Sequence, residues 1–358
     1  MKQRVALLFG GRSAEHDVSL LSARNIYEAI DRNLYDVSLI GITRDGRWWL
    51  QEKGEFPESI ACEHQVAMIP GGAGELVVWG KDATSQRSQI DLVMPILHGP
   101  FGEDGTVQGA LVTAGVPFVG SGVLASAVCM DKDITKRLLR EAGIPVVDWL
   151  PMRRGEQRSY ADVSATLGSD VLFVKPARMG SSIGVGRARS KESFEAATAA
   201  ALAHDDRIII EPFVDAREIE CAVLETSSQG SKLVTSWPGE IAAATHHEFY
   251  TYEAKYLDET GATLRTRADL DSDVAERIRD LAGTAFRTLN CRGLARVDFF
   301  LTKQGQIMIN EINTFPGFTR ISMYPRMMID SQMTYADLIT TLIEEARPTS
   351  VSSPTDGL

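Results

Sequence analysis

The chain has 358 residues, which at about 100–200 residues per domain predicts two or three domains. Its 44% hydrophobic and 24% charged residues are typical of a globular protein and argue against long disorder. The 37 Lys and Arg against 48 Asp and Glu give a net charge of −11, so no global basic field would attract nucleic acid or an anionic membrane. Any phosphate site must therefore be local.

The cysteines and the apolar runs bear on the compartment. Four cysteines are far apart and form no CxxC pair, which disfavours a zinc cluster or a disulfide framework: Cys62, Cys129, Cys221 and Cys291. No apolar run approaches the roughly 18 residues needed to span a bilayer, and the first residues lead into a strand-like segment instead of a signal-peptide core. We therefore expect a cytoplasmic protein with neither a membrane nor nucleic acid as partner.

The first third of the chain alternates predicted strands and helices. An apolar run at 5–9 ends in Gly10-Gly11, and a segment with helical spacing follows Ser13, which reads as a helix cap. Strands are predicted at 37–42, 92–97 and 116–119 and a helix at 109–114, while residues 52–80 are predicted to be a peripheral insertion. This alternation is typical of a mostly parallel sheet, here over residues 1–122.

Two further units follow. A predicted helix at 131–142, stopped by Gly143, opens a small α+β unit over residues 123–212, with strands at 171–174, 183–185 and 208–210 and a helix at 191–203. The last unit, residues 213–347, contains predicted strands at 218–224, 293–301 and 306–312 and helices at 273–289 and 335–346. The tail at 348–358 is rich in Ser, Thr and Pro and is predicted to be disordered.

The last two predicted strands carry the most informative polar residues. Strand alternation puts Arg296 and Asp298 on one face of the first strand, and Glu311 and Asn313 on one face of the second. If Gln304-Gly305 is a two-residue hairpin loop, Asp298 lies opposite Glu311 and Arg296 lies opposite Asn313.

Two opposed carboxylates repel each other unless a cation lies between them. The oxygen donors Asp, Glu and Asn suit Mg²⁺, which shares its shell with water and substrate phosphates. The alternative is a solvated face whose charges are offset by Arg296. The apolar neighbours indicate a strand buried on both sides, which favours the metal: Phe299, Phe300, Ile309 and Ile312.

A glycine- and serine-rich loop follows Lys175 at the end of a predicted strand. Such a loop exposes backbone N–H groups to phosphate oxygens, and glycine permits close approach. The sequence is not GxxxxGK[ST] and opens no helix, so a Walker-type site is excluded and a plain β-turn is the alternative. Arg178 within the loop either adds charge near phosphate or faces solvent.

Three other segments have both a functional and a structural interpretation. His98 follows a predicted parallel strand, where α/β sheets bind ligands, but it could equally be a core histidine, and the neighbouring Glu103 could be a helix N-terminal charge. Capping alone explains Glu15 in the first turn after Ser13. The aromatic run at 249–256 is either a lid or an edge strand.

Taken together and in order, these segments resemble the D-alanine:D-alanine ligase family of ATP-grasp enzymes. The resemblance covers about residues 5–342, and the segments that carry it are GGRSAEHDVSL, HGPFGEDGTVQG, GSGVLASAVCMDK, VKPARMGSSIGVG, EFYTYEAKY, ARVDFF, INEINTFPGFT and SMYP. It implies an α/β protein, α+β in its C-terminal parts, with the ATP-grasp fold and an N-terminal Rossmann-like domain. ATP would lie between the central and C-terminal domains, with two Mg²⁺ ions, for which Mn²⁺ can substitute.

The resemblance also implies an activity. Two D-alanines would be joined through a D-alanyl phosphate, giving ADP and phosphate, to supply D-alanyl-D-alanine for the peptidoglycan precursor. A homodimer is the family expectation.

The implied site residues are assigned position by position. Arg296 and the backbone N–H of Gly317 would stabilise the oxyanion, and the metals would be held by Asp298, Glu311 and Asn313. ATP would be bound by Lys132, Lys175, Glu211, Phe213, Glu218, Lys255 and Asn310. The first D-alanine would contact Glu15, Ser181, Tyr256 and His98, and the carboxylate of the second would be received by Ser322 and the backbone of Met323.

Tyr256 bears on the subtype. Family members that make the D-alanyl-D-lactate ester do not keep this tyrosine, so its presence, with Met323 instead of arginine, favours the dipeptide ligase. Another acceptor remains the alternative within the fold. A non-catalytic nucleotide-binding protein would be expected to have lost one of Glu15, Arg296, Asp298 or Glu311, and a dehydrogenase would need GxGxxG. The departures from the family pattern are Phe315 and the segment at 265–268.

Overall fold

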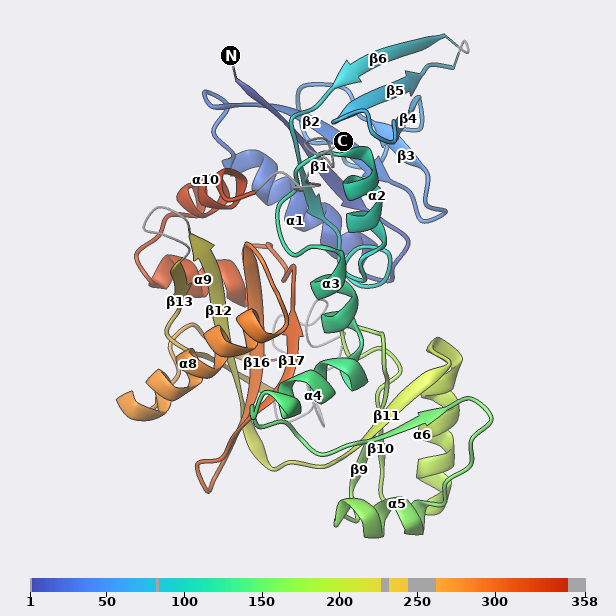
Figure 1. Ribbon diagram of the computed structural model, residues 1–358, viewed down its shortest axis with the longest axis vertical. Coiled ribbons are helices and arrows are strands. Elements are labelled where there is room, and N and C mark those ends of the chain that lie inside the picture. The colour runs from blue at the N-terminus through green and yellow to red at the C-terminus, as the bar shows by residue number, and fades with distance from the viewer. Residues whose placement is uncertain (1, 82–83, 227–231, 244–261, 347–358) are drawn as a thin grey trace, which may run out of the picture.

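The computed structural model describes residues 2–81, 84–226, 232–243 and 262–346. Its strands form three sheets, which follow one another along the long axis of the molecule, with the first at the top of Figure 1, the third in the middle and the second at the bottom. No helix in these ranges is long and apolar enough to cross a bilayer.

The first sheet has a parallel centre. β1 (Gln3–Gly10) lies between β2 (Tyr35–Ile42) and β7 (Leu92–Ile96) and is parallel to both, which confirms the strands and direction predicted there. Residues 5–9 of β1 are fully buried, since parallel strands are covered on both faces. α1 (His16–Ala29) follows β1 and α2 (Thr106–Ala114) follows β7.

The rest of this sheet is antiparallel and differs from the prediction. Beyond β2 come β3 (Trp48–Leu50), β4 (His64–Met68), β5 (Glu75–Trp79) and β6 (Ser85–Gln89). Residues 52–80 lie toward one edge of the sheet, as expected of a peripheral segment, but they also extend it, because β4 and β5 are ladder strands. The predicted strand at 116–119 is wrong: only Phe118 bridges to Val93, and Pro117 has no N–H with which to extend the ladder.

The second sheet is antiparallel, in the order β10-β9-β11-β8. After α3 (Val123–Met130) and α4 (Lys132–Glu141), the chain forms β8 (Leu150–Arg153), α5 (Tyr160–Leu167), β9 (Leu172–Pro176), β10 (Gly186–Ala188), α6 (Lys191–His204) and β11 (Arg207–Pro212). The strand predicted at 183–185 is wrong. Ser181, Ser182 and Gly184 have φ of 51°, 59° and 71°, and this left-handed backbone forms turns that delay the strand to Gly186.

The third sheet carries the long hairpin. Its strands are β12 (Ala216–Thr226), β13 (Lys232–Thr235), β14 (Gly239–Ala243), β15 (Ala262–Arg265), β16 (Leu294–Thr302) and β17 (Ile307–Asn313), with β16 between β12 and β17. α8 (Ser272–Thr288) packs its apolar face, with Ile278 and Phe286, against Val223 and Val297 of the sheet.

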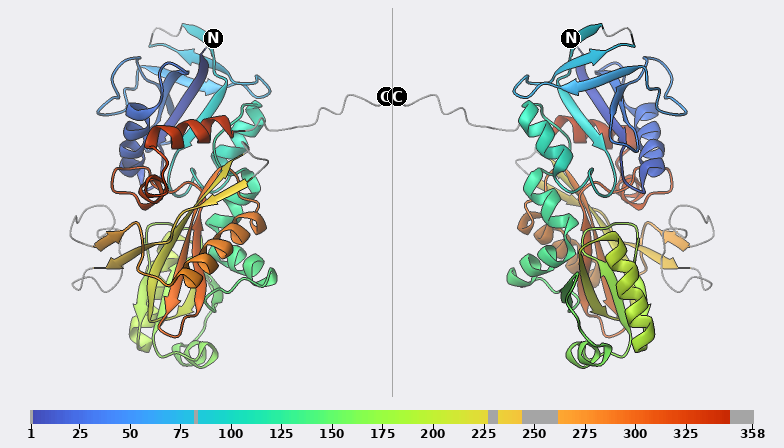
Figure 2. Two further views of the ribbon diagram at one scale, coloured as in Figure 1. Left: turned by 90° about the vertical axis from the view of Figure 1, so that its left-hand side faces the viewer. Right: turned by 90° about the vertical axis from the view of Figure 1, so that its right-hand side faces the viewer.

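The last two helices join the first and third sheets. α9 (Met323–Asp330) and α10 (Tyr335–Glu344) contribute Tyr324 and Leu338 to one core that also contains Val5 and Leu7 of β1. Both views in Figure 2 show α10 beside the N-terminal part of the molecule. This shared core holds the loop after β17 against the loop after β7.

The β16–β17 hairpin pairs the two residues that the sequence predicts to be opposite each other, but its loop is longer than predicted. Asp298 pairs with Glu311, which confirms the prediction, whereas Phe299 pairs with Ile309. The loop has three residues, 303–305, because Thr302 donates to the carbonyl of Gln306 and Gly305 adopts φ 78°. A bulge between the two pairs leaves Asn310 as the extra residue, and it restores the register that a two-residue loop would have given.

Candidate active site

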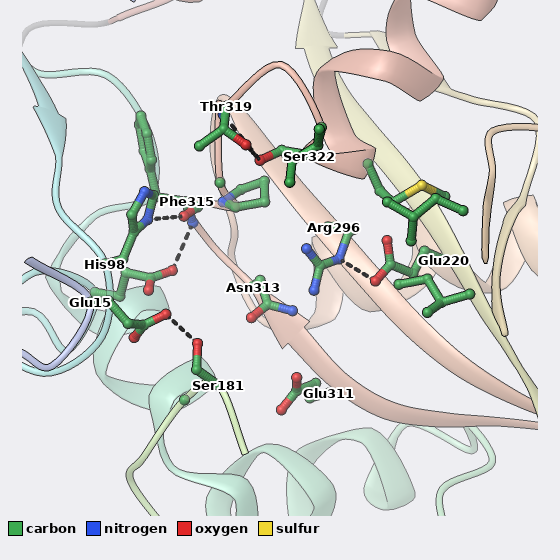
Figure 3. Close-up of a pocket in the computed structure, with 18 residues that line it drawn as sticks. Glu15, His98, Ser181, Glu220, Arg296, Glu311, Asn313, Phe315, Thr319 and Ser322 are labelled. Carbon is green, nitrogen blue, oxygen red and sulfur yellow. Dashed lines mark hydrogen bonds and ion pairs between the residues drawn. The ribbon is translucent and has the colours of Figure 1, made fainter. Parts of the chain in front are cut away.

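A pocket opens where the first sheet, the loop at 180–182 and the β16–β17 hairpin meet (Figure 3). Loops beside the first and second sheets and strands of the third sheet contribute the polar side chains of its lining: Glu15, His98, Glu103, Ser181, Glu220, Arg296, Glu311 and Asn313. The loop and helix start at 315–323 close its remaining side.

Glu15 and Ser181 meet across this pocket. Ser13 Oγ donates to the carbonyl of His98 at 2.6 Å and accepts the N–H of Glu15 at 3.1 Å. The predicted cap at Ser13 is wrong, because the N-cap of α1 is Glu15, whose side chain makes no capping bond. Its carboxylate instead accepts a hydrogen bond from Ser181 Oγ, 166 positions away (Figure 3).

The backbone of Phe315 is held at both its N–H and its carbonyl by the loop after β7. Glu103 Oε1 accepts the N–H of Phe315 at 3.2 Å, and Glu103 Oε2 accepts the N–H of Gly99 at 2.7 Å. His98 Nδ1 lies 3.2 Å from the carbonyl of Phe315, and its Nε2 lies 3.1 Å from Ser22 Oγ. A carbonyl only accepts, so Nδ1 carries the proton and Nε2 is the acceptor.

Burial sets the protonation states of His98 and Glu103. It lowers the pKa of His98 to about 4, so the ring is neutral at pH 7. Burial, together with the charge of Glu15, raises the pKa of Glu103 to about 8, against the opposing effect of the two backbone N–H donors. His98 is thus a buried positioning group, and Glu103 is more than a helix N-terminal charge.

Arg296 lies between two carboxylates. Its Nε and Nη2 donate to Oδ1 and Oδ2 of Asp298, both at 2.7 Å, and Nε also lies 3.1 Å from Glu220 Oε1. Asn313 Nδ2 donates to Asp298 Oδ2 at 3.0 Å. Burial acts to lower the pKa of Arg296, but Asp298 and Glu220 raise it well above its usual range, so the guanidinium stays charged.

The bulge at Asn310 brings one more side chain to the site. Strand alternation alone would turn Asn310 away from Glu311, yet both border the same cavity. Lys175 Nζ is 3.5 Å from Asn310 Oδ1, and Lys132 Nζ is 3.6 Å from Glu311 Oε2. Lys132 also donates to the carbonyl of Met179 at 2.6 Å, so it links the glycine-rich loop to β17.

This second cavity, of about 430 Å³, lies between the second and third sheets. Its size is within the range of small-molecule sites. It contains all the predicted ATP residues that the structure describes: Lys132, Lys175, Glu211, Phe213, Glu218 and Asn310. Phe213 is 44% exposed and stacks on Phe173 with ring centroids 6.1 Å apart, which provides a flat apolar wall.

Two lysines hold Glu211 at the end of this cavity. Its Oε2 lies 2.6 Å from Lys175 Nζ and its Oε1 lies 2.7 Å from Lys136 Nζ. Burial acts to raise the pKa of Glu211, but the two ammonium groups lower it to about 2. Glu211 is therefore an ionised acceptor of fixed orientation.

The opposite end of the first pocket contains Gly317, Ser322 and Met323. Ser322 Oγ accepts the N–H of Thr319 at 3.0 Å and lies 2.8 Å from Thr319 Oγ1. A Cβ on Gly317 would lie 2.9 Å from Ser322 Oγ, so a larger residue here would displace this hydroxyl. Ser322 is also the N-cap of α9, and Met323 is buried.

Arg178 lines neither cavity, and its side chain is 46% exposed, so the interpretation that it faces solvent holds in part. Its guanidinium pairs with Asp205 and Asp206, and its N–H donates to Asp205 Oδ2 at 2.8 Å. The residue therefore ties the glycine-rich loop to the turn before β11.

Sequence reasoning assigned no site role to Glu103, Lys136 or Glu220. Glu220 follows Glu218 at strand spacing, and Lys136 follows Lys132 by one helical turn. Because residues at these spacings share a face of a strand or a helix, the patterns could have placed Glu220 and Lys136 near the site. Glu103 instead depends on a loop contact that no sequence pattern encodes. The predicted Lys255 and Tyr256, and the predicted disorder at 348–358, lie outside the described residues.

Solved structures with similar folds establish the class. The chain is similar to the D-alanine-D-alanine ligase from Coxiella burnetii, with a TM-score of 0.81 and 34% identity over 96% of this chain and 95% of that one. It is also similar to the VanG D-Ala:D-Ser ligase from Enterococcus faecalis, with a TM-score of 0.84 and 33% identity over 97% and 100% of the two chains. The protein is an ATP-dependent ligase with the ATP-grasp fold, as the resemblance implied.

Sequence relatives identify the family within this class of ligases. Residues 4–121 match the family description "D-ala D-ala ligase N-terminus", and residues 138–344 match "D-ala D-ala ligase C-terminus". The D-alanine–D-alanine ligase A of Mesorhizobium japonicum is 49% identical over 351 residues, which cover 96% of this chain and 97% of that one. The chain belongs to the D-alanine–D-alanine ligase family.

Proposed function

We propose that this chain joins two D-alanine molecules to D-alanyl-D-alanine at the expense of ATP, for peptidoglycan synthesis. The observation that carries the proposal is the pairing of Glu15 with Ser181 on one side of the pocket, facing Arg296 and Gly317 on the other, beside a nucleotide-sized cavity. An ammonium-binding carboxylate and an oxyanion-binding guanidinium are what an amino-acid acyl transfer needs.

In this proposal, Glu15 binds the ammonium of the first D-alanine and Ser181, with Tyr256, fixes that carboxylate. A carboxylate oxygen of the substrate attacks the γ-phosphorus, and the bond to the ADP oxygen breaks. The amine nitrogen of the second D-alanine then attacks the acyl carbon. Arg296 and the backbone N–H of Gly317 stabilise the tetrahedral oxyanion, which collapses as phosphate leaves and takes up the proton that the nitrogen loses.

The remaining assigned residues bind and orient. His98, a neutral ring, holds the Phe315 loop near the carboxylate of the first substrate. Ser322 and the backbone of Met323 receive the carboxylate of the second. Glu211, Phe213 and Glu218 bind the adenosine part of ATP, and its phosphates contact Lys132, Lys175, Lys255 and Asn310.

A divalent metal belongs to the proposal. Asp298, Glu311 and Asn313 are oxygen donors on neighbouring strands, and Asp298 directly opposes Glu311, a set that fits Mg²⁺ or Mn²⁺. These three residues would hold two ions, which when bound neutralise charge on the phosphates. Asp298 also pairs with Arg296 and thereby links the metal set to the oxyanion site.

The acceptor is the finer part of the proposal. Tyr256 and Met323 favour an amine acceptor, D-alanine, over D-lactate. The VanG structure, described as a D-Ala:D-Ser ligase, is similar over nearly the whole chain, so D-serine is the second candidate acceptor.

Assembly, compartment and domain division are further parts of the proposal. The three sheets suggest domains at 1–122, 123–212 and 213–347. We also infer a homodimer that acts in the cytoplasm, where ATP is available.

The testing experiment measures ADP release by the purified protein with ATP and Mg²⁺. D-Alanine, L-alanine, D-alanine with D-lactate, and D-alanine with D-serine are compared, and products are identified by mass. Release that requires D-alanine and yields D-alanyl-D-alanine supports the proposal. Release only with another acceptor overturns the acceptor assignment, and ATP binding without turnover favours a regulatory protein.

A further inference from the structure

Glu220 is a buried carboxylate in the pocket to which the proposed reaction gives no role. It is 4% exposed and lies on β12, where it pairs with Asp298 of β16. Its Oε1 is 3.1 Å from Arg296 Nε, and Figure 3 shows it on the side of Arg296 opposite to Glu15 and Ser181. A buried carboxylate costs free energy unless it is paired, and this ion pair offsets part of that cost.

Arg296 therefore has two anionic partners of different kinds. Asp298 engages the Nε and Nη2 edge in a bidentate pair, while Glu220 forms an ion pair to Nε at the longer distance of 3.1 Å. The bidentate pair fixes the plane of the guanidinium and turns Nη1 away from Asp298.

The two partners differ in their distance from the proposed metal set. β16 lies between β12 and β17, so Asp298 is adjacent to Glu311 whereas Glu220 is one strand further away. A cation held by Asp298 and Glu311 would compete with Arg296 for the oxygens of Asp298. Glu220 is placed to keep its contact with Arg296 without joining the metal set.

We propose that Glu220 is a positioning residue, which holds Arg296 by Nε when Asp298 is engaged by a divalent cation. Without Glu220, Arg296 would be left with Asp298 as its remaining close carboxylate, and the pair would resist the cation. This inference rests on the proposed function, through the roles given to Arg296 and Asp298.

The experiment compares Glu220→Gln with a matched control on the same strand. Glu225 is also buried, and its Oε2 accepts a hydrogen bond from Arg292 Nε at 2.9 Å, but it lines neither cavity. Glu225→Gln thus removes a similar Arg–Glu pair away from the site. Two quantities are measured: steady-state kinetics, and Mn²⁺ binding by electron paramagnetic resonance with a non-hydrolysable ATP analogue.

We expect Glu220→Gln to lower kcat about tenfold or more, because it removes a buried ion-pair partner of Arg296, while KM for ATP stays within about twofold. Mn²⁺ binding should weaken about threefold or more. Glu225→Gln should change neither quantity. If kcat or Mn²⁺ affinity of Glu220→Gln equals that of Glu225→Gln, the inference is overturned.

Folding and function are controlled separately. If Glu220→Gln does not fold, Glu220→Asp takes its place, since it keeps the charge on a shorter side chain. The inference is overturned if Glu220→Asp has the kcat or the Mn²⁺ affinity of the wild type. If the wild type releases no ADP with any acceptor, the proposed function fails, and the Mn²⁺ comparison alone then decides on Glu220.

Discussion

The two sides of the pocket are built in different ways. On the hairpin side, Arg296, Asp298, Glu311 and Asn313 stand on adjacent strands, and the backbone ladder fixes their spacing. On the loop side, the side chains of Glu103 and His98 hold the backbone N–H and carbonyl of Phe315, more than 200 positions away.

The hairpin residues thus supply the charges at the site, whereas the loop residues fix the position of its backbone. The hairpin side concentrates charge that strand pairing keeps in register, so the backbone ladder sets its geometry. The loop side depends on buried titratable groups, so its geometry is coupled to stability and pH. The predictions below test that separation, from the largest expected effect to the smallest.

Glu311→Gln should abolish turnover with little loss of stability. The variant removes a proposed metal ligand, for which we expect kcat to fall about 100-fold or more, and it relieves the repulsion with Asp298. The measurement is kcat together with the thermal midpoint, with the exposed Glu276→Gln as control. Activity above a few per cent of wild type would contradict the metal assignment.

Glu103→Gln should instead change the pH dependence of stability. Because the pKa of Glu103 is raised from 4.5 to about 8, the folded protein binds a proton that the unfolded chain has lost, and stability falls as pH rises through this window. The slope is at most about 1.4 kcal/mol per pH unit. The variant should lose this slope, and it leaves one backbone N–H without its acceptor at all pH values.

Urea unfolding of wild type and Glu103→Gln at several pH values between 5 and 8 measures this difference. The exposed Glu58→Gln serves as control and should keep the wild-type slope. Parallel stability curves for wild type and Glu103→Gln would show that the carboxyl is ionised in the folded protein throughout.

Tyr256→Phe should have the smallest effect, on acceptor choice. The hydrogen bond from Ser181 to Glu15 motivates a link from Tyr256 to the same carboxylate, and loss of one hydroxyl should erode the preference for D-alanine over D-lactate about fivefold. Both acceptors are assayed side by side. An unchanged preference would remove Tyr256 from the proposed contact set.

Much of the hairpin side was predictable because strand periodicity and register are local. The prediction that Asp298 opposes Glu311 is confirmed, although two deviations cancel: the loop is one residue longer than expected, and the bulge at Asn310 absorbs it. Bulges depend on sheet twist and neighbouring strands, which a single hairpin sequence does not contain. The same limit explains the strand wrongly predicted at 183–185, where left-handed backbone follows Gly180.

By itself, the sequence determined the class of fold, the family, and the chemistry of the hairpin, since these depend on apolar runs, strand alternation and ordered short motifs. Only the tertiary structure decided that Glu103 and His98 hold Phe315, that Lys136 and Lys175 fix Glu211, and that Glu220 shares Arg296. These contacts join segments far apart in the chain, and their charges and pKa values are set by burial, which is a property of the packed molecule and not of any segment.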